Sequence, residues 1–332
     1  MRYSRIAGTG SYVPDRVVTN DELAKLMDTS DEWIRERSGI RERRFAAEDQ
    51  STADLALFAA RNAMDAAGWE PGDLDFIVFA TISPDYYFPG NGVLLQAALD
   101  TPQIGALDVR NQCTGFVYAL AAADGFVRMG LYNKVLVVGA EIQSAGLDLT
   151  TKGRDTAVLF GDGAGAVCLE AVEDETGGRI LDHHLHSDGN HADDLAILAP
   201  SSRCRPFVTS KMIEEGKTSP QMNGREVYRH AVLRFPQVIK AILEANGYSA
   251  DDVDMVVPHQ ANLRIIEAVR KRLGLPEEKV YTNVQRFGNT TAASIPLALD
   301  EAVRAERIRR GDLVCLAAFG SGFTWGASLV RF

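Results

Sequence analysis

The sequence predicts an α/β protein built from two similar halves. Strand-length apolar segments alternate with helical segments through most of the 332 residues, which favours βαβ units in a largely parallel sheet. Residues 63–78 align without gaps on residues 242–257, since in both a helix ends at a glycine, an aromatic residue and an Asp-x-Asp step follow, and a strand comes next. Residues 160–169 also match residues 319–329, allowing for a small insertion.

Two such halves would cover their sheets by stacking face to face around shared buried helices. We expect the halves to meet between Glu170 and Arg179, with residues 1–174 forming the first and residues 175–332 the second.

Composition limits the classes of function. A formal charge of -10 argues against general nucleic-acid binding. No segment stays apolar for the roughly 18 residues that a membrane span needs, and the first residues contain no apolar signal core. The cysteines form no CxxC pair, so they suggest neither a disulfide framework nor a zinc site, and a reducing cytoplasm fits best; they are Cys113, Cys168, Cys204 and Cys315.

In chain order, a first strand and a glycine turn precede two short helices capped near Thr19 and Thr29. A helix over 51–68 and a strand over 74–80 follow. The next loop, residues 83–92, carries Tyr86, Tyr87 and Phe88, and 93–99 is again helical.

A strand over 104–109 leads into a helix that runs from Cys113 to about residue 129, and another strand covers 134–140. Residues 156–170 suggest two strands joined by a glycine turn. Between residues 188 and 224 the periodicity lapses, and we interpret this excursion as a candidate lid or tunnel wall.

Cys113 is the candidate nucleophile. It lies where a strand stops and a helix starts, beside free backbone N–H groups and the positive end of the helix dipole, which favour thiolate over thiol. For an arbitrary intracellular cysteine, a small buried hydrophobe is the more common reading. The rest of the chain favours the nucleophile.

The second half supplies two polar partners. His259 follows a strand at the start of a helix, and Asn289 lies in a similar turn. Loops at the carboxyl ends of strands are where α/β sheets place their sites, so the duplication allows both residues and Cys113 to face one cavity. Both residues could also have purely structural roles. His259 could be a hydrogen-bonded core histidine, and Asn289 could simply form a turn.

Several motifs resemble the thiolase superfamily and, within it, β-ketoacyl-[acyl-carrier-protein] synthase III, over nearly the whole chain. They are Thr29-Ser-Asp-Glu-Trp33, Gln112-Cys-Thr-Gly115, Phe160-Gly-Asp-Gly-Ala-Gly165, Pro258-His-Gln-Ala-Asn-Leu-Arg264, Gly288-Asn-Thr290 and Phe319-Gly-Ser-Gly-Phe-Thr-Trp-Gly326. The resemblance implies a five-layered αβαβα fold and a homodimer paired through the sheet and the Phe88 loop.

The resemblance also implies a reaction, the decarboxylating condensation that initiates fatty-acid synthesis. Cys113 would take an acyl group from acyl-CoA, and malonyl on acyl carrier protein would then lose carbon dioxide and attack it. Backbone N–H groups of Cys113 and Ser321 would form the oxyanion hole, while His259 and Asn289 would donate to the thioester oxygen of the second substrate. No metal or redox cofactor is implied.

Contacts with the two substrates are implied by the same resemblance. Trp33, Arg37, Lys152 and Asn262 would bind CoA, and the segment Gln260, Ala261, Asn262, Leu263 and Arg264 would lie near the carrier protein. The helix after this segment also carries Arg270, Lys271 and Arg272, which would either attract an acidic carrier protein or form an ordinary solvated face.

The sequence departs from the family pattern in two places. Ser321 replaces a frequent glycine and would be strained at a positive φ, while Lys152 replaces a frequent arginine and lacks its bidentate fork.

Two rival functions stay open. One is a starter-unit or specialised-metabolite synthase, or an acyltransferase, with the same cysteine, histidine and asparagine. The other is a metal-binding protein using the histidines between His183 and His191, although strand alternation would place His184 and His186 on one face and His183 on the other.

Overall fold

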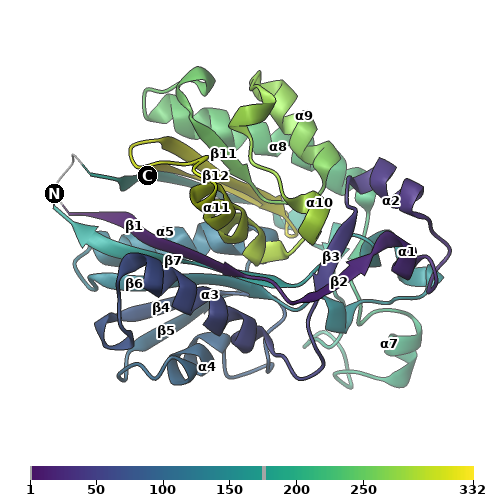
Figure 1. Cartoon of the computed structure of the whole chain (residues 1–332). Coiled ribbons are helices and arrows are strands. Elements are labelled where there is room, and N and C mark those ends of the chain that lie inside the picture. The colour runs from purple at the N-terminus through teal and green to yellow at the C-terminus, as the bar shows by residue number, and fades with distance from the viewer. Residues whose placement is uncertain (1, 174–176) are drawn as a thin grey trace.

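Two β-sheets form the frame of the protein (Figure 1). The computed structural model describes residues 2–173 and 177–332. The first sheet has the order β1-β7-β6-β4-β5. Its strands are β1 (Tyr3–Tyr12), β4 (Phe76–Ala80), β5 (Gly105–Val109), β6 (Lys134–Glu141) and β7 (Gly163–Val172). The second sheet has the order β11-β12-β13-β8, with β8 (Arg179–Ser187), β11 (Met255–Pro258), β12 (Leu313–Gly320) and β13 (Thr324–Arg331).

The two sheets repeat one pattern. In the first, β1 and β6 flank β7 in antiparallel fashion and β4 runs parallel to β6. In the second, β8 and β12 flank β13 in antiparallel fashion and β11 runs parallel to β12. The predicted duplication is therefore visible in strand order and direction, but the sheets are mixed rather than largely parallel. The boundary proposed between residues 174 and 175 lies outside the described residues.

Helices cover both faces of each sheet and produce the expected five layers. The central layer is formed by α5 (Gly115–Arg128) and α11 (Ser294–Arg304), which share one buried core with strands of both sheets. The first sheet is covered outside by α3 (Thr52–Ala67) and α4 (Asn91–Ala98). The second is covered by α8 (Gly224–Ala245) and α9 (Leu263–Leu273).

Local sequence explains the ends of several helices. The α3 helix begins with a capping box between Ser51 and Asp54 and ends at Gly68, whose φ is 69°. The α9 helix is capped by the side chain of Asn262 and ends at Gly274 in the same left-handed conformation. These signals are local, which is why they could be predicted.

Shorter elements connect the layers: α1 (Asn20–Leu23), α2 (Asp31–Ser38), α6 (Arg154–Ala157), α7 (Ser210–Glu214), α10 (Val284–Phe287), β2 (Arg16–Thr19), β3 (Glu42–Phe45), β9 (Leu195–Ala196) and β10 (Gln221–Met222). Among the described residues, no helix has the length and apolar character needed to cross a membrane.

The prediction of two strands over 156–170 was wrong. The segment begins in the helical turn α6, and a single strand, β7, starts at Gly163. Both edges of β7 are occupied by β1 and β6, which come from elsewhere in the chain, so no edge is free for a local hairpin.

The excursion between residues 188 and 224 contains α7 and a small ladder in which Leu195 pairs with Met222 and Ala196 with Gln221. Residues of this segment, among them Leu195, Ala196 and Ile197, form part of a cavity wall.

Candidate active site

Cys113 lies on the single 3-10 turn Gln112–Thr114 that joins β5 to α5. The preceding Gln112 has a φ of 48°, so the backbone turns sharply just before the cysteine. The opposite wall is Gly320, where an added Cβ would lie 2.5 Å from the Cys113 Cβ. Only glycine permits this approach, and Cys113 is left 7% exposed.

The thiol of Cys113 is protonated in the free protein. Burial and the nearby charge of Glu141 raise its pKa to about 12, against the opposing effect of hydrogen bonds from the backbone N–H groups of Ser321 and Cys113. The expectation of a thiolate stabilised by the helix terminus was therefore wrong, because the cost of desolvating a charge at this depth exceeds the effect of local dipoles.

His259 follows β11 and is 1% exposed. Its Nδ1 atom lies 2.6 Å from Oγ of Ser294, the first residue of α11. That hydroxyl also accepts a hydrogen bond from the backbone N–H of Gln260 at 3.3 Å, so its own proton is free for Nδ1. The pairing favours the imidazole tautomer with its proton on Nε2.

Burial lowers the pKa of His259 to about 3, so the ring is neutral near pH 7. Its Nε2 atom is buried and has no hydrogen-bond partner within the part of the chain that the structure describes. An unpaired buried N–H carries a desolvation cost, which a substrate oxygen placed there would relieve.

Asn289 is held between the two halves. Its backbone pairs with the segment around Phe160, donating to Leu159 O at 2.8 Å and accepting from Gly161 N at 3.1 Å. Its Oδ1 atom accepts the N–H of Thr291 at 2.9 Å, which leaves the amide nitrogen as the free end of the side chain. The side chain therefore offers a donor.

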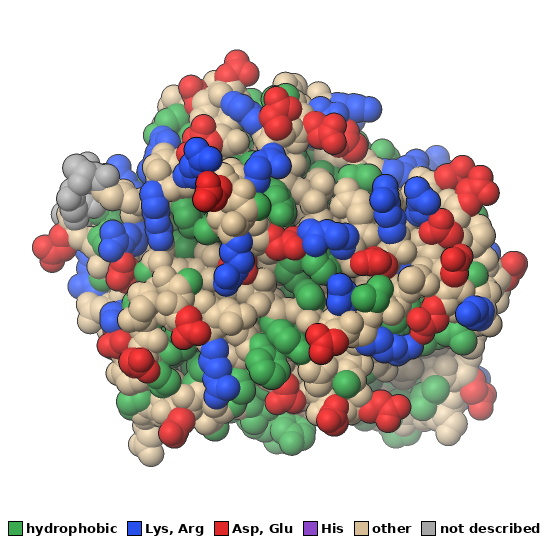
Figure 2. All heavy atoms as spheres, viewed as in Figure 1, with side chains coloured by type: hydrophobic (Ala, Val, Ile, Leu, Met, Phe, Trp, Pro, Cys, Tyr) green, Lys and Arg blue, Asp and Glu red, His purple; other side chains and the backbone are tan. Residues whose placement is uncertain are grey.

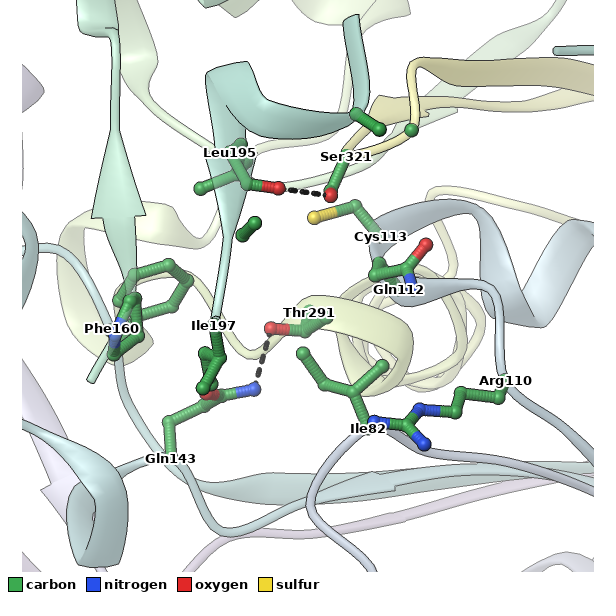
Figure 3. Close-up of a pocket in the computed structure, with 14 residues that line it drawn as sticks. Ile82, Arg110, Gln112, Cys113, Gln143, Phe160, Leu195, Ile197, Thr291 and Ser321 are labelled. Atoms are coloured by element: carbon green, nitrogen blue, oxygen red, sulfur yellow. Dashed lines mark hydrogen bonds between the residues drawn. The ribbon is translucent and has the colours of Figure 1, made fainter. Parts of the chain in front are cut away.

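Ser321 lies on the turn between β12 and β13 and is not strained, since a positive φ is found at Gly322 and not at the serine. Its hydroxyl donates to the carbonyl of Leu195 in the excursion (Figure 3). The turn that brings a backbone N–H to the sulfur is thus tied to a segment far away in sequence.

Two cavities meet at Cys113. The entrance cavity, of about 460 Å³, brings Cys113, His259 and Asn289 to one space and leads outward to Trp33 and Arg37. The inner cavity, of about 320 Å³, shares Cys113, Phe160 and Leu195 with the entrance cavity. Its wall includes apolar side chains, among them Ile82, Phe160, Leu195 and Ile197, and polar ones, namely Arg110, Gln112, Gln143 and Thr291 (Figure 3).

Comparison with known proteins shows the family of the chain. Family models of 3-oxoacyl-[acyl-carrier-protein] synthase III match residues 107–189, and those of its C-terminal part match residues 243–332. A β-ketoacyl-[acyl-carrier-protein] synthase III of Xanthomonas oryzae is 53% identical over 333 residues, covering 99% of this chain and 98% of that protein. The chain belongs to the β-ketoacyl-[acyl-carrier-protein] synthase III family. It is a condensing enzyme of the acyltransferase class.

Solved structures give the same result for the fold. The synthase III from Thermus thermophilus is 43% identical, with a TM-score of 0.91 and 99% coverage of both chains. The priming β-ketosynthase from the R1128 polyketide biosynthetic pathway is 33% identical, with a TM-score of 0.89, and the match covers 99% of this chain and 96% of that one.

Of the residues predicted to bind CoA, three line the entrance cavity of this synthase III and one does not. Trp33, Arg37 and Asn262 are in its wall. Lys152 is exposed and donates instead to Glu214 O at 2.7 Å, tethering α7. The sequence reasoning missed Arg154, whose guanidinium lies 4.7 Å from the Trp33 ring centre, while that of Arg37 lies 4.5 Å away.

The indole of Trp33 is therefore contacted by two cations at the mouth of the cavity. Arg154 lies far from Trp33 in sequence, so only a long-range contact reveals it. Asn262 is partly engaged, because its Oδ1 caps α9 and its Nδ2 donates to Arg37 O at 3.1 Å.

The five residues predicted to lie near a carrier protein differ in how exposed they are. Gln260 is 1% exposed, and its amide donates to the carbonyls of Pro258 and Tyr281 and accepts from the N–H groups of Asn283 and Val284. It is a structural linker and is closed to a partner in this structure. Arg264 is exposed, and Ala261, Asn262 and Leu263 are half-buried.

The histidines between residues 183 and 191 do not converge. His183 faces Ser328 and Asp124, His184 lies near Asp182, and His186 stacks on Trp325. His191 pairs with Asp194 at 2.9 Å and packs against His230. Within the described ranges no group of three His, Cys, Asp or Glu side chains is arranged to hold a metal ion.

Two other buried residues were missed. Glu141 accepts hydrogen bonds from the 81–83 segment and from Ala292, and burial raises its pKa to about 7. Gln143 donates to the hydroxyl of Thr291 at 2.9 Å. Glu141 ends β6 and Gln143 lies two residues beyond it, and a carboxylate at the end of an otherwise apolar strand is the signal that could have found Glu141.

Proposed function

We propose that this enzyme joins an acyl group from an acyl-CoA primer to malonyl carried on acyl carrier protein, and so initiates fatty-acid biosynthesis. The observation that carries the proposal is the meeting of Cys113, His259 and Asn289 in one cavity that opens beside Trp33. A nucleophile and two neutral donors are what a decarboxylating condensation needs.

In the first half-reaction Cys113 attacks the carbonyl carbon of the acyl-CoA thioester. The bond to the CoA sulfur breaks, CoA leaves, and the acyl group stays on the enzyme. Because the pKa of the thiol is about 12, its proton leaves as the new bond forms and ends on the departing CoA sulfur, so CoA is released as a thiol. The N–H groups of Cys113 and Ser321 stabilise the sulfur charge and then the oxyanion.

In the second half-reaction the malonyl group loses carbon dioxide. The electron pair of the breaking bond forms an enolate, whose oxygen receives hydrogen bonds from His259 Nε2 and the Asn289 amide. The carbanion end of the enolate attacks the acyl carbon on Cys113 and releases the sulfur. The released sulfur takes up a proton from solvent, so electrons and atoms balance without a metal or redox cofactor, and we propose that none is used.

We propose that acyl carrier protein docks at the mouth of the entrance cavity. Arg37, Arg225 and Arg264 are exposed there, on a chain whose net charge is -10. An acidic carrier would be attracted to this local cationic rim. On the face shown in Figure 2, acidic and basic side chains are interspersed.

We also propose a cytoplasmic homodimer. Tyr86, Tyr87 and Phe88 are 59%, 66% and 81% exposed, and Phe207 packs edge-on against Tyr87 at 5.4 Å between ring centres. Such an exposed aromatic patch is costly in water unless a second copy covers it.

The experiment follows both half-reactions separately. Cys113→Ala should abolish the mass increase seen by intact-mass spectrometry after incubation with acyl-CoAs. His259→Ala and Asn289→Ala should keep that increase and lose condensation with malonyl-acyl carrier protein. Full condensation by the Cys113→Ala variant would refute the proposal.

A starter-unit synthase of specialised metabolism is the second candidate, favoured by the likeness to the R1128 priming ketosynthase. Such a synthase uses the same chemistry with a different primer. Comparing which acyl-CoAs acylate Cys113 in the mass-spectrometry experiment therefore distinguishes the two functions.

A further inference from the structure

Two buried hydrogen bonds connect the wall of the inner cavity to the side chain of Asn289. Gln143 and Thr291 form part of the inner cavity wall, and Asn289 forms part of the entrance cavity wall. The Gln143 amide donates to the Thr291 hydroxyl at 2.9 Å (Figure 3), and the backbone N–H of Thr291 donates to Asn289 Oδ1 at 2.9 Å. Gln143, Thr291 and Asn289 are 6%, 1% and 7% exposed, so both bonds are shielded from water.

Thr291 has a backbone conformation that its residue type rarely adopts. Its φ is 49°, in the left-handed region, where the Cβ of a β-branched residue is crowded. Such a conformation persists only where the surrounding structure holds it. Among the described residues, Gln143 is the one hydrogen-bond partner of the Thr291 hydroxyl. The direction of the Thr291 N–H therefore depends on the Gln143 amide.

The residue after Thr291 is fixed by β6 in a different way. The carbonyl of Ala292 passes so close to Gly139 that a Cβ on the glycine would lie 2.3 Å from the carbonyl oxygen. The N–H of Ala292 donates to the Glu141 carboxylate at 3.4 Å. These contacts anchor the backbone beyond Thr291, so the Gln143 bond is the one that acts on the threonine itself.

We propose that Gln143 is a positioning residue for condensation, which acts on Asn289 through Thr291. A terminal carboxamide has two orientations of similar shape, which exchange its oxygen and its NH2 group. The Thr291 N–H on Oδ1 selects the orientation that leaves the NH2 group for the enolate oxygen. In the other orientation the carboxamide oxygen would face the enolate oxygen, and two acceptors repel each other.

This inference rests on the proposed function, in which Asn289 acts on the second substrate only. Acylation of Cys113 uses the backbone N–H groups of Cys113 and Ser321, and neither belongs to the chain of bonds that begins at Gln143. Loss of the Gln143 amide should therefore slow condensation and spare acylation. A general loss of stability would not separate the two half-reactions in this way.

The test measures two rates on one preparation. Intact-mass spectrometry follows the formation of acyl-Cys113, and a single-turnover assay follows the reaction of preformed acyl-enzyme with malonyl-acyl carrier protein. The primer is the shortest acyl-CoA that acylates the wild type, because Gln143 lies across the cavity from the sulfur (Figure 3). Gln143→Leu and Thr291→Val should each slow condensation about tenfold and change acylation less than about twofold.

A double-mutant cycle and two further variants complete the design. The double variant should be about as slow as either single variant, because each single change removes the same bond. Thr291→Ser keeps the hydroxyl and should condense within about threefold of the wild type. Gln96→Leu is the matched control, since the Gln96 amide also donates to a threonine hydroxyl, that of Thr101 at 3.1 Å, and lines neither cavity. It should keep both rates.

Three results would overturn the inference. Gln143→Leu could leave condensation unchanged, or it could slow acylation and condensation equally. The effects of the two single variants could also multiply in the double variant, which would show that Gln143 acts without Thr291. Because Thr291→Val removes the same bond from its other end, the test stands if one variant fails to fold.

Failure of the proposed function gives a different result. In that case the wild-type acyl-enzyme does not react with malonyl-acyl carrier protein at all. Normal condensation by both the wild type and Gln143→Leu defeats only the positioning role of Gln143.

Discussion

Replacing Ser294 by alanine should separate the two half-reactions. The hydroxyl of Ser294 lies 2.6 Å from His259 Nδ1 and receives the Gln260 N–H, so it fixes which imidazole nitrogen carries the proton. Without it, Nδ1 is left buried and unpaired, and the tautomer with its proton on Nδ1 is no longer disfavoured. The Nε2–H donor that stabilises the enolate is then present for only part of the time.

The size of the effect follows from that one bond. Leaving a buried ring nitrogen without a partner costs about 1–3 kcal/mol, and roughly 1.4 kcal/mol corresponds to tenfold in rate. We therefore expect Ser294→Ala to lower the rate of malonyl decarboxylation and condensation about tenfold. Acylation of Cys113 should change less than about twofold, because the oxyanion hole of that step is built from backbone groups.

The assay measures carbon dioxide release from malonyl-acyl carrier protein and acyl-enzyme formation on the same preparation. Ser328→Ala is a matched control, since Ser328 is fully buried and its Oγ lies 2.8 Å from Nδ1 of another histidine, His183, that lines neither cavity. The control should lose stability and keep both rates. An equal fall of acylation and condensation in Ser294→Ala, or no fall in either, would refute the reasoning.

Other variants test the CoA site, the thiol and the dimer. Trp33→Ala should raise the KM for acyl-CoA about tenfold through loss of ring stacking, whereas Lys152→Ala should leave it within about twofold, as measured by initial rates. Glu141→Gln removes a charge that helps to raise the pKa of Cys113, so the midpoint of thiol alkylation against pH should move to lower pH; an unmoved midpoint would exclude that electrostatic effect. Phe88→Asp should shift the protein toward monomer in light scattering at micromolar concentration, and an unchanged dimer would place the interface elsewhere.

The pKa of Glu141 also has a consequence for stability. Burial raises this pKa to about 7, above the usual value of 4.5, so between these values the folded chain binds more protons than the unfolded chain. The contribution of Glu141 to stability is thus complete below about pH 4.5 and is lost as the pH rises through about 7. Between about pH 4.5 and 7, the free energy of unfolding measured by chemical denaturation should therefore fall less for Glu141→Gln than for the wild type.

Much of the fold could be predicted because its signals are local. The caps of α3 at Ser51 and Gly68 depend on a few adjacent residues, and the repeat of residues 63–78 in 242–257 depends on side-chain order alone. The partners of β7 could not be found in this way, because they are supplied by β1 and β6 at distant positions. Strand direction within a sheet is decided by such partners.

The candidate site likewise has a part that could be predicted from the sequence and a part that could not. Cys113 and His259 each follow a strand in a recognisable motif, whereas Asn289, expected at a similar junction, lies in the turn after α10. Arg154 beside Trp33 and Ser294 beside His259 are contacts between segments that no sequence period relates.

The protonation state of Cys113 was the main error, and its cause shows how the site is controlled. The N–H groups of Ser321 and Cys113 favour the thiolate, but burial and the charge of Glu141 outweigh them in the free protein. A thiol with a pKa of about 12 reacts slowly with oxidants and stray electrophiles, because the thiolate is the nucleophile. Its reactivity must therefore depend on the bound thioester, whose developing oxyanion uses the same N–H groups only when a substrate occupies the cavity.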